Sequence, residues 1–319
     1  VVFDKLEWVA IGVFGMTLFT RFWIIRALPY PAWSDSLHHT LLTHLTAVQG
    51  KLPLTMEPYY PIQLGQCHLG LYSLSAVVEW LGQVPAHTAL LWTAQVLNGL
   101  CGLGVYLVLD RKVGRIGAVV GAAVVGLLSH QPSFYVNWGR FTQVSGQTIL
   151  LAAWLVTWET IALWKSSWQE RKGKPVWNTL LAAVLTGAVF LLHFRVAAFS
   201  APLLLMTVVW ESWKAREDKA LGRLILGTAA IGFLALVVVA PVAWEAVRIF
   251  VSTRSGSPNI PEDTLQVVRQ QYFHFPWKTV PVLVAHTWLL ITACVSAGLG
   301  LLRRSKMVAV TVPSALSLD

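Results

Sequence analysis

The sequence predicts an all-α polytopic membrane protein with about eight transmembrane helices and further juxtamembrane helices at the outer surface. Of its 319 residues, 55% are hydrophobic and 12% are charged, whereas charged residues make up about a quarter of an ordinary soluble domain. Several apolar runs reach the roughly 20 residues that a helix needs to cross the hydrocarbon layer. These observations exclude an ordinary soluble domain and predict a single transmembrane domain over residues 1–319.

The apolar runs are separated by polar or proline-containing segments. The predicted spans are 8–28, 88–109, 113–129, 144–164, 177–192, 196–213, 224–244 and 279–302. The segment 67–81 is apolar but short, and counting it as a span would reverse the charge pattern, so we expect a juxtamembrane or re-entrant helix there. Because Pro202 lies early in the sixth run, the connection at 193–195 could instead extend to about Ala201.

The distribution of lysine and arginine predicts the orientation. These residues gather at 110–115, 165–176, 214–223 and 303–306. Since cytoplasmic loops are enriched in Lys and Arg, we expect those segments and the N-terminus to be cytoplasmic, with the long loops 29–87 and 245–278 outside. The net charge of +9 could also suggest nucleic-acid binding. The topology rule explains the basic span ends more simply, so we expect no nucleic-acid partner.

The first outer loop holds the richest set of reactive side chains. Ser34 and Asp35 predict the start of an amphipathic helix over 36–49, because both side chains can accept hydrogen bonds from free N–H groups. Asp35, His38 and His39 share its first turn. They could perform acid–base chemistry, and Asp35 with His39 could hold a divalent cation. Alternatively, Asp35 only caps the helix and the histidines are solvated.

Two further groups lie later in the same loop. Glu57 is a second acid that could approach Asp35, although an ordinary surface position explains it equally well. His68 opens the segment 67–81 and is a further candidate for substrate binding.

A polar stripe leads into the span 144–164. Asn137, Arg140, Gln143 and Gln147 recur at helical spacing there. Such a stripe faces protein or a water-filled cavity, since lipid cannot satisfy it. Arg140 could therefore belong to a buried anion site, or it could extend to the headgroups.

A second candidate phosphate ligand lies between two spans, where His193 and Arg195 have almost no loop around them. The guanidinium of Arg195 suits a phosphate because it offers paired donors in one plane. Contact with an ordinary lipid headgroup is the alternative. For Arg21 and Arg26, near the outer end of the first span, we expect extension to the membrane surface.

These residues and their order resemble the C-type glycosyltransferases, polytopic enzymes that use lipid-phosphate-linked sugars. That superfamily places an acidic motif directly after the first span, where this chain has Ser34-Asp35-Ser36. Juxtamembrane helices follow in the same loop, as 36–49 and 67–81 would, and the next span ends in basic residues. The strings Asp35–His39, Asn137–Gln147 and His193–Val196 are similar to those of uncharacterised bacterial membrane proteins of this type.

The resemblance implies transfer of a hexose from a polyprenyl-phosphate-linked sugar to an acceptor at the outer membrane face. Asp35 would be the catalytic acid or base, or would hold a divalent cation (Mg or Mn), with His38, His39 and Glu57 assisting. Many members carry paired acids, and here only Glu57 could replace the second one. The substrate and its phosphate or pyrophosphate would be bound by His68, Asn137, Arg140, Gln143, His193 and Arg195.

The resemblance also implies the plasma membrane of a prokaryote. The alternative is a non-catalytic structural or lipid-binding subunit of a larger membrane complex, since the small-residue run 117–126 also suits packing between helices. A transporter is less expected, because the span middles offer Gln95 and Asn98 but no carboxylate. The expected partners are membrane lipids, a polyprenyl-phosphate sugar and, for the subunit alternative, other membrane proteins.

Overall fold

The protein is a bundle of long helices. The computed structural model describes residues 4–61, 64, 68–165, 174–215, 220–254 and 287–302, and these contain helices and no strands. Seven stretches are long and apolar enough to cross a membrane. The helices involved are α1 Lys5–Ile25, α4 Ala86–Lys112, α5 Arg115–Ala123 with its continuation to Asn137, α7 Phe141–Lys165, α8 Lys174–Leu192, α9 Phe194–Ala215 and α10 Leu221–Arg254. The predicted class, an all-α polytopic membrane protein, is confirmed.

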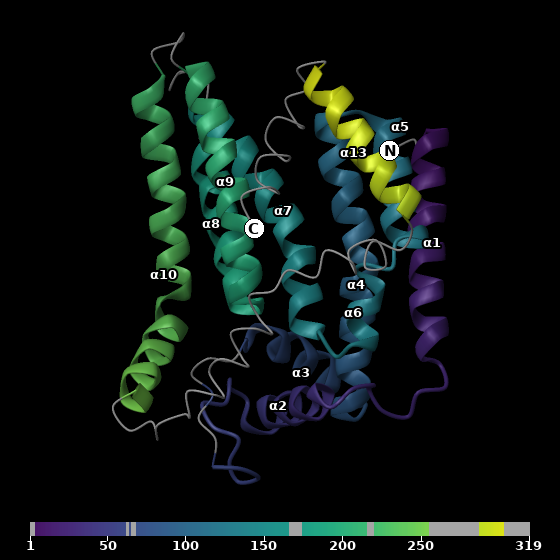
Figure 1. Ribbon diagram of the computed structural model, residues 1–319. Helices are drawn as coiled ribbons and strands as arrows, with labels where there is room; N and C mark the ends of the chain where they lie inside the picture. The colour runs from purple at the N-terminus through teal and green to yellow at the C-terminus, as the bar shows by residue number, and fades with distance from the viewer. Residues whose placement is uncertain are drawn as a thin grey trace, which may run out of the picture.

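Two shorter helices lie across one end of this bundle. They are α2, Asp35–Gln49, and α3, Gly70–Gly82, and Figure 1 shows them at the end opposite the N-terminus. The helix predicted over 67–81 is thus not a span. Its buried side chains, including Leu71, pack with α4, α7 and α8 in a core that also contains Leu90 and Phe141. This core supports the α2–α3 end, where the candidate site lies.

The third span is less regular than predicted. After α5 the chain forms a π-helix, η1, over Val124–Leu128, and then a short helix, α6, over Ser133–Asn137. The prediction placed 130–143 in a short connection between the spans 113–129 and 144–164. In a π-helix the hydrogen bonds run to the fifth residue, and such turns are frequent at functional sites.

Two connections differ from the prediction. The connection between α8 and α9 is the single residue His193, because α9 begins at Phe194 and accommodates Pro202 inside the helix. The extended connection to Ala201 is therefore wrong. Helix α10 continues to Arg254, beyond the predicted loop start at 245. The rest of that loop lies outside the described residues, as does the start of the predicted eighth span, whose second part forms α13, Thr287–Leu302.

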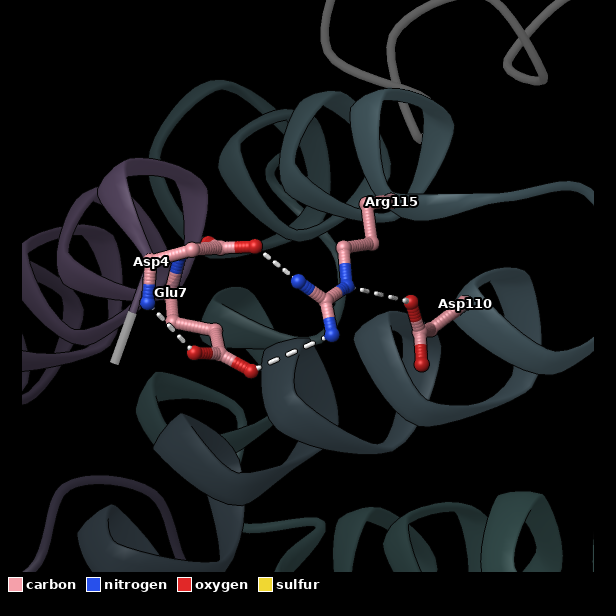
Figure 2. A network of polar contacts seen from close by, with 4 residues as sticks. All are labelled: Asp4, Glu7, Asp110 and Arg115. Atoms are coloured by element: carbon pink, nitrogen blue, oxygen red, sulfur yellow. Dashed lines mark hydrogen bonds and ion pairs between the residues drawn. The ribbon is translucent and has the colours of Figure 1, made fainter. Parts of the chain in front are cut away.

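Charged side chains tie three helices together at the N-terminal end of the bundle (Figure 2). Asp4 caps α1 in a reciprocal arrangement with Glu7, each side chain accepting from the other's backbone N–H. Arg115, the first residue of α5, pairs with Asp4, with Glu7 at 3.3 Å and with Asp110 of α4 at 3.9 Å. Because these groups are largely solvent-accessible, the network fixes the arrangement of the helix ends more than it adds stability.

A buried polar cluster lies at the same end of the bundle, between α7 and α9. Glu211 is 2% exposed, and its carboxylate accepts from Trp158 Nε1 at 2.8 Å and from Lys165 Nζ at 3.3 Å. Arg223 of α10 donates to the Lys165 carbonyl at 2.9 Å. The ends of the spans that carry these basic residues thus share the N-terminal end of the bundle, and helices α2 and α3 lie at the other end (Figure 1). That the N-terminal end is cytoplasmic remains a prediction from the charge pattern.

We predict that Glu211→Ala destabilises the protein by roughly 3 kcal/mol, because it removes the buried acceptor of both Lys165 and Trp158. Thermal unfolding of purified protein in detergent measures the effect. The matched control is Glu159→Ala, which removes a carboxylate from the residue of α7 that follows Trp158. This variant should change the melting temperature little. Equal melting temperatures for the two variants would contradict the role assigned to Glu211.

Candidate functional site

Asp35 is the first residue of α2, where the sequence predicted the start of a helix. Ser34 occupies the N-cap position, but its side chain makes no capping hydrogen bond, so the expected capping role is wrong. The Asp35 carboxylate instead lies 3.2 Å from Arg140, through Oδ2 and Nη1. Both side chains are 42% exposed, so this ion pair is accessible to a ligand from outside the protein.

The approach of α2 to the start of α7 depends on Gly139. This glycine has φ 66°, and a Cβ there would lie 3.1 Å from Ser36 Oγ and 3.3 Å from Trp33 Cβ. A side chain at this position would therefore separate the chain before α2 from the chain before α7. Trp33 itself has φ 78°, a strained conformation for a bulky residue. This close packing places Arg140 beside Asp35.

His39 joins three elements and is engaged by protein groups. Its Nδ1 lies 2.7 Å from the Tyr72 hydroxyl, it hydrogen bonds the Gly139 backbone, and its ring meets Phe141 edge-on. Burial lowers the pKa of His39 to about 4, against the opposing effect of the Asp35 charge, so the ring is neutral near pH 7. His39 therefore positions α2 on α3 and α7.

His68 and His193 form a stacked pair, with ring centroids 4.0 Å apart. The backbone N–H of Phe194 donates to His68 Nδ1, and that of Val196 donates to His193 Nδ1, both at 3.3 Å. With Nδ1 accepting, each neutral ring carries its proton on Nε2. Each ring therefore has an Nε2–H that can donate a hydrogen bond, and the stacked pair joins the chain before α3 to the α8–α9 connection.

Both rings of this pair are held neutral. Burial, followed by the charge of Arg195, lowers the pKa of His68 to about 4. Burial, followed by His68, Arg195 and Arg140, lowers the pKa of His193 to about 3. Because both guanidinium groups act on His193, the structure brings Arg140 and Arg195 to the same region. Arg195 is exposed in the first turn of α9, its guanidinium 5.8 Å from the centroid of the Phe194 ring.

These side chains make an electropositive site, which we call the Arg140–Arg195 site: Asp35, Arg140, His68, His193 and Arg195. It offers two guanidinium groups and two neutral imidazole rings that can donate from Nε2. Within the described part of the chain, Asp35 is the only carboxylate paired with either arginine. The arrangement suits an oxyanion such as a phosphate, next to a carboxylate that can accept a proton.

Several predicted site residues lie apart from the Arg140–Arg195 site. His38 is exposed on α2, and Glu57 is exposed in a turn where its N–H donates to Thr55; no contact among the described residues joins Glu57 to Asp35. Gln143 and Gln147 donate to the Tyr135 hydroxyl at 3.3 and 3.4 Å, so this part of the stripe faces protein.

Arg21 and Asn137 line a cavity that is described below, and Arg21 is buried at 6% exposure. Its expected extension to the membrane surface is wrong. Arg26 is exposed, and its guanidinium lies 3.9 Å from the centroid of the Trp23 ring. The hydrogen bond between Tyr72 and His39 and the buried position of Arg21 were not predicted from the sequence. For Tyr72 a signal was present, because the spacing of Leu69, Tyr72 and Ala76 indicates a buried helix face.

The divalent cation stays a prediction. Its proposed ligands were Asp35 and His39, but the Nδ1 of His39 is engaged by Tyr72. Over the residues that the structure describes, no three His, Cys, Asp or Glu side chains are grouped so that they could hold a metal ion. Asp35 is thus the remaining candidate ligand on the protein side.

The depressed histidine pKa values predict a pH-dependent stability. Because the folded pKa of each ring lies below the unfolded value of about 6.5, the unfolded chain binds more protons at mildly acidic pH. The contribution of these histidines to stability is fully present above about pH 6.5. It is lost as the pH falls toward the folded pKa values of about 4 for His68 and about 3 for His193. Each unit of pKa difference contributes about 1.4 kcal/mol.

Melting temperatures of wild type and His68→Phe across this pH range test the prediction. The phenylalanine keeps an aromatic ring against His193 but cannot be protonated. The melting temperature of this variant should therefore fall less than that of wild type as the pH is lowered. His38→Phe, at an exposed position of α2, is the control. Identical pH profiles for wild type and His68→Phe would contradict the account.

Comparison with protein-family models, with characterised proteins and with solved structures finds no match to this chain. The function therefore has to be argued from the chemistry of the site and its place in the bundle. Those are an exposed ion pair, two neutral imidazole rings and a second guanidinium at the end of a membrane-spanning bundle.

Proposed function

We propose that this protein is a membrane glycosyltransferase that moves a sugar from a polyprenyl-phosphate-linked donor to an acceptor hydroxyl. The observation that carries the proposal is the grouping of Asp35 and Arg140 with His68, His193 and Arg195 at one end of a transmembrane bundle. Phosphate recognition and proton acceptance are the two tasks that such a transfer requires of the protein.

The order of elements agrees with the resemblance to C-type glycosyltransferases. The acid Asp35 follows the first span, and two helices that do not span, α2 and α3, come before α4, which ends in Arg111 and Lys112. This is the arrangement that the resemblance implies, and it supports the proposal.

The two helices that lie across this end of the bundle expose apolar side chains, which suits a lipid-linked substrate. Leu37 of α2 is 73% exposed, and Trp80 and Leu81 of α3 are 50% and 83% exposed. Apolar side chains exposed on surface helices insert into the boundary between headgroups and hydrocarbon. A polyprenyl chain can thus remain in the membrane while its phosphate reaches the Arg140–Arg195 site.

Transfer would proceed by breaking the C1–O bond of the donor. The leaving phosphate takes the electron pair, and its growing negative charge is stabilised by Arg195 and by the Nε2–H donors of His68 and His193. These groups are already held in place, so they need little reorganisation during the reaction.

Asp35 would act as the base toward the acceptor. Arg140 contacts Oδ2 of the carboxylate, which leaves Oδ1 to accept the proton of the acceptor hydroxyl as its oxygen bonds to C1. Asp35 is the residue that would hold a divalent cation, and such a cation would supply further stabilisation of the developing negative charge. Arg140 thereby positions the base and also contributes to the positive charge at the site.

The structure weakens one argument for a non-catalytic subunit. Glycines of the run 117–126 pack inside the chain: a Cβ at Gly121 would meet Leu109 of α4, and one at Gly126 would meet Thr17 of α1. These glycines therefore serve packing within the chain. Membrane lipids remain proposed partners.

We predict that Asp35→Asn and Arg195→Ala each lower the rate of sugar transfer by about 100-fold or more, since each removes a group that acts in the transition state. The assay follows the release of polyprenyl phosphate from a set of polyprenyl-phosphate sugars by the protein in lipid vesicles. Glu57→Gln and His38→Gln change exposed residues of the same loop and should keep the activity.

Binding of polyprenyl phosphate, measured by native mass spectrometry, separates recognition from chemistry. Arg195→Ala should weaken this binding, whereas Asp35→Asn should keep it. Full transfer activity in both folded variants would contradict the proposal, as would wild-type protein that neither binds polyprenyl phosphate nor transfers a sugar.

A further inference from the structure

A polar cavity lies near the α2–α3 end of the bundle, between α1, α4 and α6. Its volume is about 140 Å³, and its polar lining comprises Arg21, Gln95, His130, Ser133 and Asn137. Arg21 lies four residues before the end of α1, which corresponds to about 6 Å along a helix. The cavity is therefore near the level where the span meets the headgroups.

Arg21 brings a positive charge into this cavity, and its hydrogen bonds among the described residues go to neutral groups. Its Nε donates to Asn98 Oδ1 at 3.1 Å, and its Nη2 donates to the Gly126 carbonyl at 2.8 Å. Over the described ranges of the chain, no carboxylate lies within ion-pair distance of it. Burying a charge without a counter-ion is costly, so an anion in the cavity would stabilise the site.

The surroundings of Arg21 are tightly packed. Gly126, which accepts from Nη2, belongs to the π-helix η1 and packs directly on α1, where a Cβ would lie 2.4 Å from Thr17 Oγ1. Thr17 is 2% exposed. The guanidinium is thus held by a specific helix contact, and it is not free to extend to the membrane surface.

A second, independent observation concerns Gln95 of α4. Its side chain is 2% exposed and lines the same cavity. Its Oε1 atom is buried and has no hydrogen-bond partner among the described residues. A buried oxygen without a donor is unfavourable, so a ligand that satisfies it must carry a hydroxyl or another donor.

We infer that this cavity binds a phosphate-type oxyanion that also carries a hydroxyl group, with an anionic oxygen on Arg21 and the hydroxyl donating to Gln95 Oε1. Chloride and an ionised simple carboxylate would satisfy Arg21 but would leave Gln95 without a donor. Two sources have the required chemistry: protonated inorganic phosphate from solution, and the headgroup of a hydroxyl-bearing phospholipid such as phosphatidylglycerol. This cavity is separate from the Arg140–Arg195 site.

The test compares variants of the full chain in phosphatidylcholine nanodiscs. Inorganic phosphate is titrated while the melting temperature is followed, and bound phosphatidylglycerol is counted by native mass spectrometry after it is added to the discs. At least one probe should bind wild type, and Arg21→Gln and Gln95→Leu should each weaken that binding about tenfold or more. Arg26→Gln, an exposed arginine at the same end of α1, should bind as wild type does.

The outcomes separate the two sources and the two sites. Binding of phosphate alone assigns the cavity to a soluble anion, and binding of phosphatidylglycerol alone assigns it to a lipid headgroup. If Arg21→Gln does not fold, Gln95→Leu decides, because it leaves the protein contacts of Arg21 in place. The inference is overturned if neither probe binds wild type, if Gln95→Leu binds normally, or if Arg195→Ala rather than the cavity variants abolishes binding.

Discussion

Hydrocarbon can neither donate nor accept a hydrogen bond, and this constraint determines where the polar side chains of the protein lie. Along the spans, polar groups find partners inside the bundle, as Trp158 and Glu211 do between α7 and α9. At the ends, charged groups reach water and one another, as in the network around Arg115 (Figure 2). Arg21 is buried within a span, and its hydrogen bonds go to a side-chain amide and a π-helical carbonyl.

The Arg140–Arg195 site depends on close backbone contacts at the α2–α3 end of the bundle. Gly139 allows α2 to approach α7, and the stacked pair of His68 and His193 joins the chain before α3 to the α8–α9 connection. His39 and Tyr72 connect α2 with α3. Residues that are distant in sequence thus surround one accessible ion pair. The site is held by helix packing. It is electropositive because it contains two guanidinium groups, and among the described residues only Arg140 is paired with a carboxylate, that of Asp35.

Much of the fold could be predicted from the sequence, because apolar length and the placement of Lys and Arg report directly on membrane crossing. The same signals identified 67–81 as a surface helix, since a span there would have reversed the charge pattern. The π-helix η1 and the continuation of α10 to Arg254 could not be predicted. The π-helix η1 packs on α1, where a Cβ at Gly126 would meet Thr17, and residue spacing along one helix does not report such a contact between distant segments.

The candidate site was predicted in part. The grouping of Asp35 and Arg140 with Arg195 follows from topology, since all three residues lie at connections on the same side of the bundle, each separated from the next by two spans. Topology does not show that Asn137 lines the cavity at Arg21 and lies apart from the Arg140–Arg195 site. It also cannot show that His39 is engaged by Tyr72, because that contact depends on how α2 packs on α3.

The central claim is that the Arg140–Arg195 site binds the phosphate of a lipid-linked substrate. A cryo-EM map of the protein with bound polyprenyl phosphate tests it most directly. The account predicts phosphate density in contact with Arg195 and with at least one of His68 and His193, within reach of Asp35. Phosphate density elsewhere on the protein, with Arg195 and Arg140 pointing away from each other into lipid, would contradict it.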